Sequence, residues 1–170
     1  MLSFLFRGLT AEPARGAALF GVLTAEARQR HWYVAGEVPD TLDGRFAMLA
    51  TVTALALVRV ERDGEAGNRA AAALTERFIE VMESEHRELG VGDPTLGRTV
   101  RKLVSMLAKR IELWRSADDP NWAKAVRESL YKDEVSGEAL RHSADALKRF
   151  SQRLDAAPLD SLMQGRIDER

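Results

Sequence analysis

Apolar residues recur at steps of three and four through most of this chain, and this spacing restricts the fold more than any other feature. One uninterrupted series consists of Leu96, Val100, Leu103, Leu107, Ile111 and Trp114. Such steps place side chains on one face of an α-helix, whereas a half-buried strand needs alternation at every second residue. No window of the sequence sustains that alternation. The sequence therefore predicts an all-α fold.

Start and stop signals divide the pattern into about six helices. Gly90 is a natural stop, because glycine adopts the left-handed conformation without steric cost. Asp93 followed by Pro94 is typical of a helix start, with Asp93 as the N-cap and proline at the first helical position, and Asp119-Pro120 repeats the signal. The expected helices run over 13–33, from Asp40 or Thr41 to Val60, over 69–89, from Asp93 to Trp114, from Asp119 to Leu130, and from a Ser136 cap to Leu154. The helix that reaches Val60 is apolar nearly all round, so we expect it at the centre of the bundle.

Length and composition favour one helical-bundle domain. The chain has 170 residues, 25 basic and 26 acidic residues and no cysteine. The absence of cysteine excludes a disulfide scaffold, a cysteine-ligated metal and a thiol nucleophile. The neutral balance argues against a DNA-binding protein. We expect the domain at 13–157, an N-terminal segment at 1–12, and a tail at 158–170 with a short helical turn followed by disorder.

The uncharged stretch 46–58 is shorter than the roughly 20 apolar residues that span a bilayer, so it predicts a buried helix. The N-terminus lacks the basic region of a secretory signal, which favours a cytoplasmic protein. Four apolar residues near it share one helical face: Leu2, Leu5, Phe6 and Leu9. Their spacing suits peripheral contact with the inner membrane, and a terminus that packs locally is the favoured alternative.

The motifs of common catalytic and metal sites are missing. There is no phosphate-binding loop and no G-x-S-x-G segment. Glu83 and His86 have the Glu-x-x-His spacing, but a di-iron bundle needs two such pairs and two further glutamates. The other histidines, His31 and His142, lack a glutamate at that spacing. We therefore expect no metal, no cofactor and no enzymatic activity.

Charges are unevenly distributed between two neighbouring helices. The helix over 69–89 directs Glu76, Glu80 and Glu83 outward. The next helix carries a strip of basic side chains opposite its apolar face: Arg98, Arg101, Lys102 and Lys109. One interpretation is two solvated faces that pair across a helical hairpin. The other is a partner surface for RNA, the ribosome or an acidic protein.

Glu85 falls within an apolar stripe, between Met82 and Leu89. A buried carboxylate needs a charge partner or hydrogen bonds, because desolvation otherwise favours its neutral form. We therefore predict a structural ion pair between Glu85 and either Arg45 or Arg110.

Two segments, within residues 31–115, together resemble the ubiquinol–cytochrome c chaperone family. Residues 39–49 are similar to its "P-x-T-x-x-G-R-F-x-x-L" segment, and residues 87–103 to its "R-E-x-G-V-G-D…G-K-x-V" segment, with Arg98 where the family usually has lysine. The residues that match the two motifs are Thr41, Gly44, Arg45 and Phe46 in the first, and Leu89, Gly90, Val91, Gly92, Asp93 and Arg101 in the second.

The resemblance implies a non-catalytic assembly factor for the cytochrome bc complex. It implies that the protein binds newly made cytochrome b, near the ribosomal tunnel exit and with a small partner. Arg45 and Phe46 are the residues of the first motif that we predict to contact a partner, together with the basic strip. The alternative is a helical carrier of an apolar small molecule such as a quinone or a lipid. An exposed apolar groove beside the basic strip would favour the chaperone, and a closed internal cavity would favour the carrier.

Overall fold

The helix at the centre of the molecule is α3 (Leu42–Val60), which is buried along almost its whole length. Its surface is largely alanine, valine and leucine, and even Thr51 and Thr53 are inaccessible to solvent. Small residues allow α4, α5, α6 and α7 all to pack directly against it. The expectation that this apolar helix lies at the core is confirmed.

The computed structural model describes residues 16–168 and contains no strand in that range. Residues 16–27 are helical. The remaining elements follow in this order: α2 (Arg30–Val34), α3, η1 (Glu61–Asp63), α4 (Gly64–Glu88), α5 (Asp93–Arg115), η2 (Asp119–Asn121), α6 (Trp122–Leu130), α7 (Gly137–Ala156) and α8 (Leu159–Met163). The predicted all-α, single-domain architecture is confirmed. Within residues 16–168, none of the helices combines the length and the apolar composition that spanning a bilayer requires.

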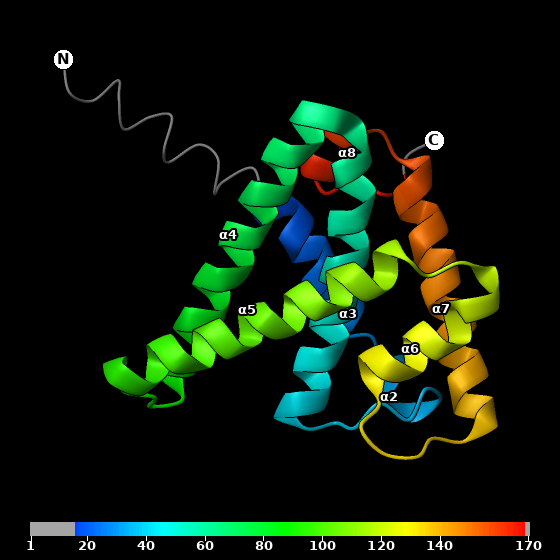
Figure 1. Cartoon of the computed structure of the whole chain (residues 1–170), viewed down its shortest axis with the longest axis horizontal. Coiled ribbons are helices and arrows are strands. Elements are labelled where there is room, and N and C mark those ends of the chain that lie inside the picture. Colours follow the sequence, from blue (N-terminus) through cyan, green and yellow to red (C-terminus); the bar gives the residue numbers. More distant parts are fainter. Residues whose placement is uncertain (1–15, 169–170) are drawn as a thin grey trace.

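Figure 1 shows how the helices surround α3. α4 and α5 form a V-shaped hairpin whose tip extends beyond the lower part of α3, and α6 and α7 lie on the other side of α3. The hairpin therefore projects from the bundle, and a part of each of its helices is left without a helical neighbour on one side.

Most of the predicted helix ends lie where the capping residues are. The hydroxyl of Thr41 accepts a hydrogen bond from the backbone N–H of Gly44 (3.1 Å), and that of Ser136 accepts one from Ala139 (3.1 Å). Gly90 follows α4 with a φ of 82°, which confirms its role as a helix stop. α5 is capped by Gly92, so Asp93 is its first residue rather than its cap. An acidic residue in the first turn of a helix interacts favourably with the positive end of the helix dipole.

The single helix expected over 13–33 is wrong in its second half. The chain leaves the helical conformation at Gln29, where ψ is 133°, and α2 begins at the next residue. The break lets the Trp32 indole turn inward, where it is fully buried and donates to the backbone oxygen of Glu26 (2.9 Å). The expected start at Pro13 and the segment 1–12 lie outside the described residues.

Two other boundaries also differ from expectation. α4 begins at Gly64, five residues before the predicted start at 69, because Gly64 adopts a φ of 63° and turns the chain directly from η1 into α4. The predicted short turn after Pro158 is present as α8. The expected disorder after it is wrong up to residue 168, because Ile167 is buried in the core and Asp168 pairs with Arg153.

Candidate functional site

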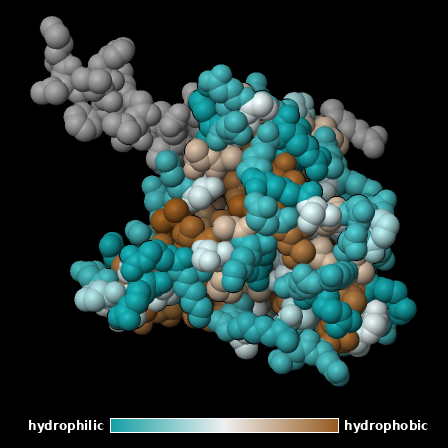
Figure 2. Space-filling view, in the orientation of Figure 1, coloured by the Kyte–Doolittle hydropathy of each residue, from teal (hydrophilic) through white to brown (hydrophobic). Residues whose placement is uncertain are grey.

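A groove of about 1570 Å³ lies between the first half of α3, the facing parts of α4 and α5, and the end of α6. α5 contributes residues at helical spacing, among them Lys102, Leu103 and Met106, and α4 contributes Val81 and Met82 from the opposite side. Figure 2 shows hydrophobic surface beneath α5, beside the lower end of α3. The groove therefore combines a largely apolar floor with charged groups at its edges.

The most exposed large hydrophobic side chains of the described chain all line this groove. They are Val34, Leu42 and Leu89, with 62%, 61% and 60% of their surface accessible. They come from α2, from the first turn of α3 and from the end of α4. Single exposed leucines are ordinary, but three around one apolar groove are typical of a surface that binds a partner.

The first sequence motif forms one wall of the groove, from Pro39 to Ala47. Gly44 is needed there because the chain folds back on itself. A Cβ atom on Gly44 would lie only 1.8 Å from the carbonyl oxygen of Pro39. Together with the Thr41 cap, this close approach fixes how α3 begins. Thr41 and Gly44 therefore shape the wall of the groove.

Arg45 and Phe46 leave this wall in different directions. The Arg45 side chain is 65% exposed and donates to the carboxylate of Asp40 (2.7 Å), which raises the pKa of the guanidinium. Phe46 is half-buried, and its ring centroid lies 6.1 Å from that of Phe78 in the core. Both residues line the groove, Arg45 as an accessible cation and Phe46 as part of the floor.

The predicted ion pair of Glu85 is wrong. Glu85 is exposed at the edge of the groove, and in the described chain it pairs with neither Arg45 nor Arg110. The physical reason is the projecting hairpin. The last turns of α4 extend beyond the bundle, so the apolar stripe that passes through Glu85 faces the open groove instead of the core.

Gly90, Gly92 and Asp93 lie at the turn between α4 and α5, at the tip of the hairpin. No neighbouring atom lies within 4 Å of a Cβ added at Gly90 or Gly92. Gly90 is required by its positive φ, whereas Gly92 caps α5 with an ordinary extended conformation. The second motif therefore accounts for the geometry of the hairpin, and its Leu89 for one exposed side chain of the groove.

The basic strip is exposed on α5. None of Arg98, Arg101, Lys102 and Lys109 forms an ion pair in the described chain, and no ion pair there joins α4 to α5. Glu80 of α4 pairs with Arg77 within the same helix. Of the two interpretations, the one in which the two faces pair across the hairpin is therefore wrong. Lys102 lines the groove, and the other three lie outside its lining.

Arg110 lines the groove where α5 meets the end of α6. It donates to the backbone oxygens of Met106 (3.1 Å) and Ser129 (2.7 Å), and its Nε is buried without an acceptor. Burial lowers the pKa of this guanidinium, and no carboxylate counteracts that effect.

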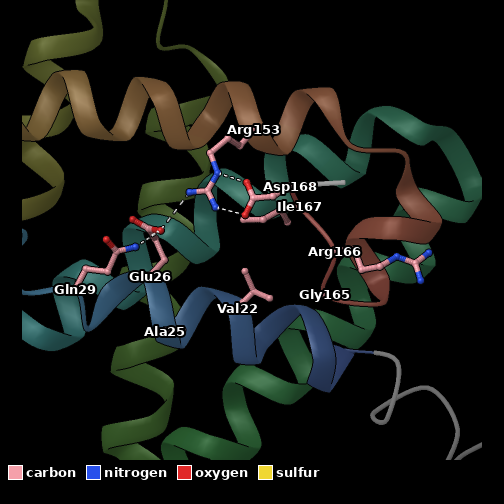
Figure 3. Close-up of a pocket in the computed structure, with 9 residues that line it drawn as sticks. All are labelled: Val22, Ala25, Glu26, Gln29, Arg153, Gly165, Arg166, Ile167 and Asp168. Carbon is pink, nitrogen blue, oxygen red and sulfur yellow. Dashed lines mark hydrogen bonds and ion pairs between the residues drawn. The ribbon is translucent and has the colours of Figure 1, made fainter. Parts of the chain in front are cut away.

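A second hollow, of about 620 Å³, lies between the helix of residues 16–27 and the C-terminal segment. Figure 3 shows Arg153 reaching from α7 between Glu26 and Asp168. The guanidinium lies 3.5 Å from the Glu26 carboxylate and 2.6 Å from that of Asp168. Burial raises the pKa of Glu26 and Arg153 counteracts this, while the bond from Arg153 lowers the pKa of Asp168.

This cluster escaped the sequence analysis, although Glu26 falls on the stripe of Leu19 and Leu23 and is only 6% exposed. The carboxylates of Glu26 and Asp168 both interact with the Arg153 guanidinium, so the arrangement fastens the C-terminal segment to the bundle. Within residues 16–168, no group of three or more potential metal ligands occurs.

A histidine pair links α2 to α7. Nδ1 of His31 lies 3.0 Å from Nε2 of His142. Burial and the neighbouring His142 and Arg149 lower the pKa of His31, which favours its neutral form. A hydrogen bond between two imidazoles requires at least one neutral ring, whose unprotonated nitrogen accepts. His86 bonds through Nδ1 with the backbone oxygen of Met82 (2.7 Å), which occupies one of its two ring nitrogens.

Comparisons with known proteins agree on one family. A family model described as ubiquinol–cytochrome C chaperone matches residues 35–169. The crystal structure of the Cbp3 homolog from Brucella abortus is similar over 97% of this chain and 94% of that chain, with 29% sequence identity and a TM-score of 0.74. No curated protein matches the sequence.

Proposed function

This chain belongs to the ubiquinol–cytochrome c chaperone family, and from that premise we propose that it assists assembly of the reductase by holding newly made cytochrome b in the groove. The role is non-catalytic: the groove supplies a binding surface, and the client is released without chemical change. A polytopic membrane protein exposes apolar helices before they are inserted or assembled, and these need a partner that covers them.

The observation that carries this proposal is the position of Val34, Leu42 and Leu89. In water such exposed apolar area is unfavourable, by about 25 cal/mol per Å². A bound apolar helix would remove it from water together with the floor of the groove. The open shape of the groove also supports a polypeptide client over the alternative, a quinone or lipid carrier, because a small apolar ligand is usually enclosed on most sides.

The basic strip supports a second part of the proposal, contact with the ribosome. Three of its cations, Arg98, Arg101 and Lys109, lie outside the groove lining and have no carboxylate partner in the described chain. Ribosomal RNA presents dense phosphate charge, which exposed and unpaired arginine and lysine side chains bind through counterion release. In this arrangement the groove would remain free for a client while the strip holds the ribosome.

The test is co-purification of cytochrome b with a tagged copy of the chain during active translation in its own host. We expect Leu42→Glu combined with Leu89→Lys to lose most of the cytochrome b. The charges are chosen to keep the fold, because glutamate suits the first turn of a helix and lysine the last. Both side chains are already exposed, so we expect a change in stability of no more than about 1 kcal/mol.

The matched control places the same charges at exposed sites outside the groove, Ala66→Glu in the first turn of α4 and Gln152→Lys in the last turns of α7. This variant should retain cytochrome b. Equal recovery with both double variants, each folded to the wild-type extent, would contradict the groove as the client site.

A further inference from the structure

Arg110 differs from the other partly buried arginines of the described chain. Arg59 pairs with Asp63, Arg77 with Glu80, and Arg153 with Glu26 and Asp168. Arg110 has only two backbone carbonyls, and its buried Nε has no acceptor. A guanidinium removed from water is stable only when its charge and its donors are satisfied, so this one lacks a counter-ion.

The missing counter-ion cannot come from the nearby acidic residues of the groove. Asp40 is held by Arg45, and Asp43 by Lys132. Glu128 pairs with Lys124. The other acidic residues of the lining, Glu85, Glu88 and Asp133, form no hydrogen bond or ion pair with Arg110. A carboxylate that reaches Arg110 must therefore arrive with whatever fills the groove.

The shape of the groove indicates a helix. α5 lines it from Thr99 to Arg110, which is about 16 Å or three helical turns at 1.5 Å per residue. α4 forms the opposite side of the V, so an added helix would pack between two helices, as amphipathic helices do in apolar grooves. Leu103 and Met106 precede Arg110 on the wall, so apolar side chains would come before the charged one.

We propose that the groove binds a helical, mostly apolar segment of another polypeptide that carries one aspartate or glutamate, and that this carboxylate pairs with Arg110. The inference rests on the proposed function and adds the chemistry of the client segment. A carboxylate and a guanidinium match in geometry and form two parallel hydrogen bonds. A client helix without an acidic residue would leave Arg110 uncompensated when water is excluded from the groove.

The test uses two labelled synthetic peptides, each an apolar helix of three to four turns, which differ only by a central glutamate or glutamine. Binding to the full chain is followed by fluorescence anisotropy. We expect the glutamate peptide to bind roughly tenfold more tightly, and Arg110→Gln to remove that preference while the glutamine peptide still binds. Arg98→Gln, outside the groove lining, is the matched control and should keep the preference.

Arg110 also holds the end of α6, so Arg110→Gln could lose the fold. Arg110→Lys keeps the charge but lacks the planar guanidinium. We expect this variant to fold and to reduce the preference for the glutamate peptide severalfold. The comparison of the two peptides on the wild-type chain needs no variant at all.

Equal affinity of the two peptides for the wild-type chain overturns the role of Arg110 and leaves the groove function standing. Binding of neither peptide overturns the groove as a helix site as well. Loss of the preference in Lys102→Gln but not in Arg110→Gln assigns the carboxylate to Lys102 and overturns the inference. If the chain forms a dimer and the peptide dissociates it, the groove is assigned to a second copy of the chain, and the inference is overturned.

Discussion

Glu26 is a carboxylate that the fold buries between the helix of residues 16–27 and α7. It accepts a hydrogen bond from the Gln29 side chain (2.7 Å) and lies 3.5 Å from the Arg153 guanidinium. Desolvation raises its pKa in spite of these contacts. The Glu26 carboxyl group therefore stays protonated up to a higher pH in the folded chain than in the unfolded chain.

This shift predicts a pH dependence with a definite sign. Between the unfolded pKa near 4.5 and the higher folded value, the folded chain binds more protons, so Glu26 reduces stability as the pH rises through that window. Glu26→Gln cannot ionise and should lack this contribution. Thermal unfolding at pH 4 and pH 7 should show the variant gaining stability relative to wild type at the higher pH. A constant difference at both pH values would contradict the prediction.

The rule that a glutamate on an apolar stripe is buried failed at Glu85, where we applied it, and would have held at Glu26, where we did not. Glu26 and Glu85 both fall on apolar stripes, yet Glu26 is buried and Glu85 is exposed. The stripe shows which face a residue shares, but not whether a neighbouring element covers that face. That depends on the tertiary arrangement, here on whether the turn of helix lies inside the bundle or in the projecting part of the hairpin.

At the level of the element, two helices begin against a carbonyl oxygen of the preceding segment. A Cβ at Gly44 would lie 1.8 Å from the Pro39 oxygen, and one at Gly67 would lie 1.9 Å from the Val60 oxygen. No real contact is that short, so a methyl group added at either glycine must push the helix and the preceding segment apart. These glycines permit close packing at the starts of α3 and α4.

We predict that Gly44→Ala and Gly67→Ala each reduce the free energy of unfolding by about 2–4 kcal/mol, since rigid backbone has to move. Gly21→Ala is the control, because nothing lies within 4 Å of the added atom and alanine is the better helix former by about 1 kcal/mol. Denaturant titration measures all three. A stabilising effect at Gly44 or Gly67 would show that the loop before the helix yields freely.

Helix ends were predictable where a local signal defines them. Thr41, Ser136 and Gly90 act through hydrogen bonds or backbone geometry within a few residues of themselves. The break at Gln29 has no glycine or proline to mark it, because it serves the burial of Trp32. The ordered residues 164–168 depend on the contact of Asp168 with Arg153 in α7, which no local pattern shows.

For the whole molecule, the formal net charge of −1 conceals a local surface. At the groove edge Asp40 pairs with Arg45 and Asp43 with Lys132, and on α7 Asp155 pairs with Arg62. The four cations of the α5 strip have no carboxylate partner in the described chain. From the sequence, an exposed apolar groove was expected only because a chaperone would need one. Its location could not be predicted, because its lining comes from six helices and the loops between them, which meet only in the folded chain.

The strip and the groove lie close together on α5, so a test of ribosome contact has to avoid the groove. Arg98→Glu with Lys109→Glu reverses two strip charges outside the groove lining, and we expect ribosome co-sedimentation to fall roughly tenfold at low salt. Both side chains are exposed and unpaired in the described chain, so unfolding should change by less than about 0.5 kcal/mol. Arg127→Glu with Arg141→Glu changes the net charge equally at exposed sites on α6 and α7 and should retain binding. Equal losses in the two variants would mean that ribosome contact follows total charge, and no loss in the first would mean that the strip binds something else.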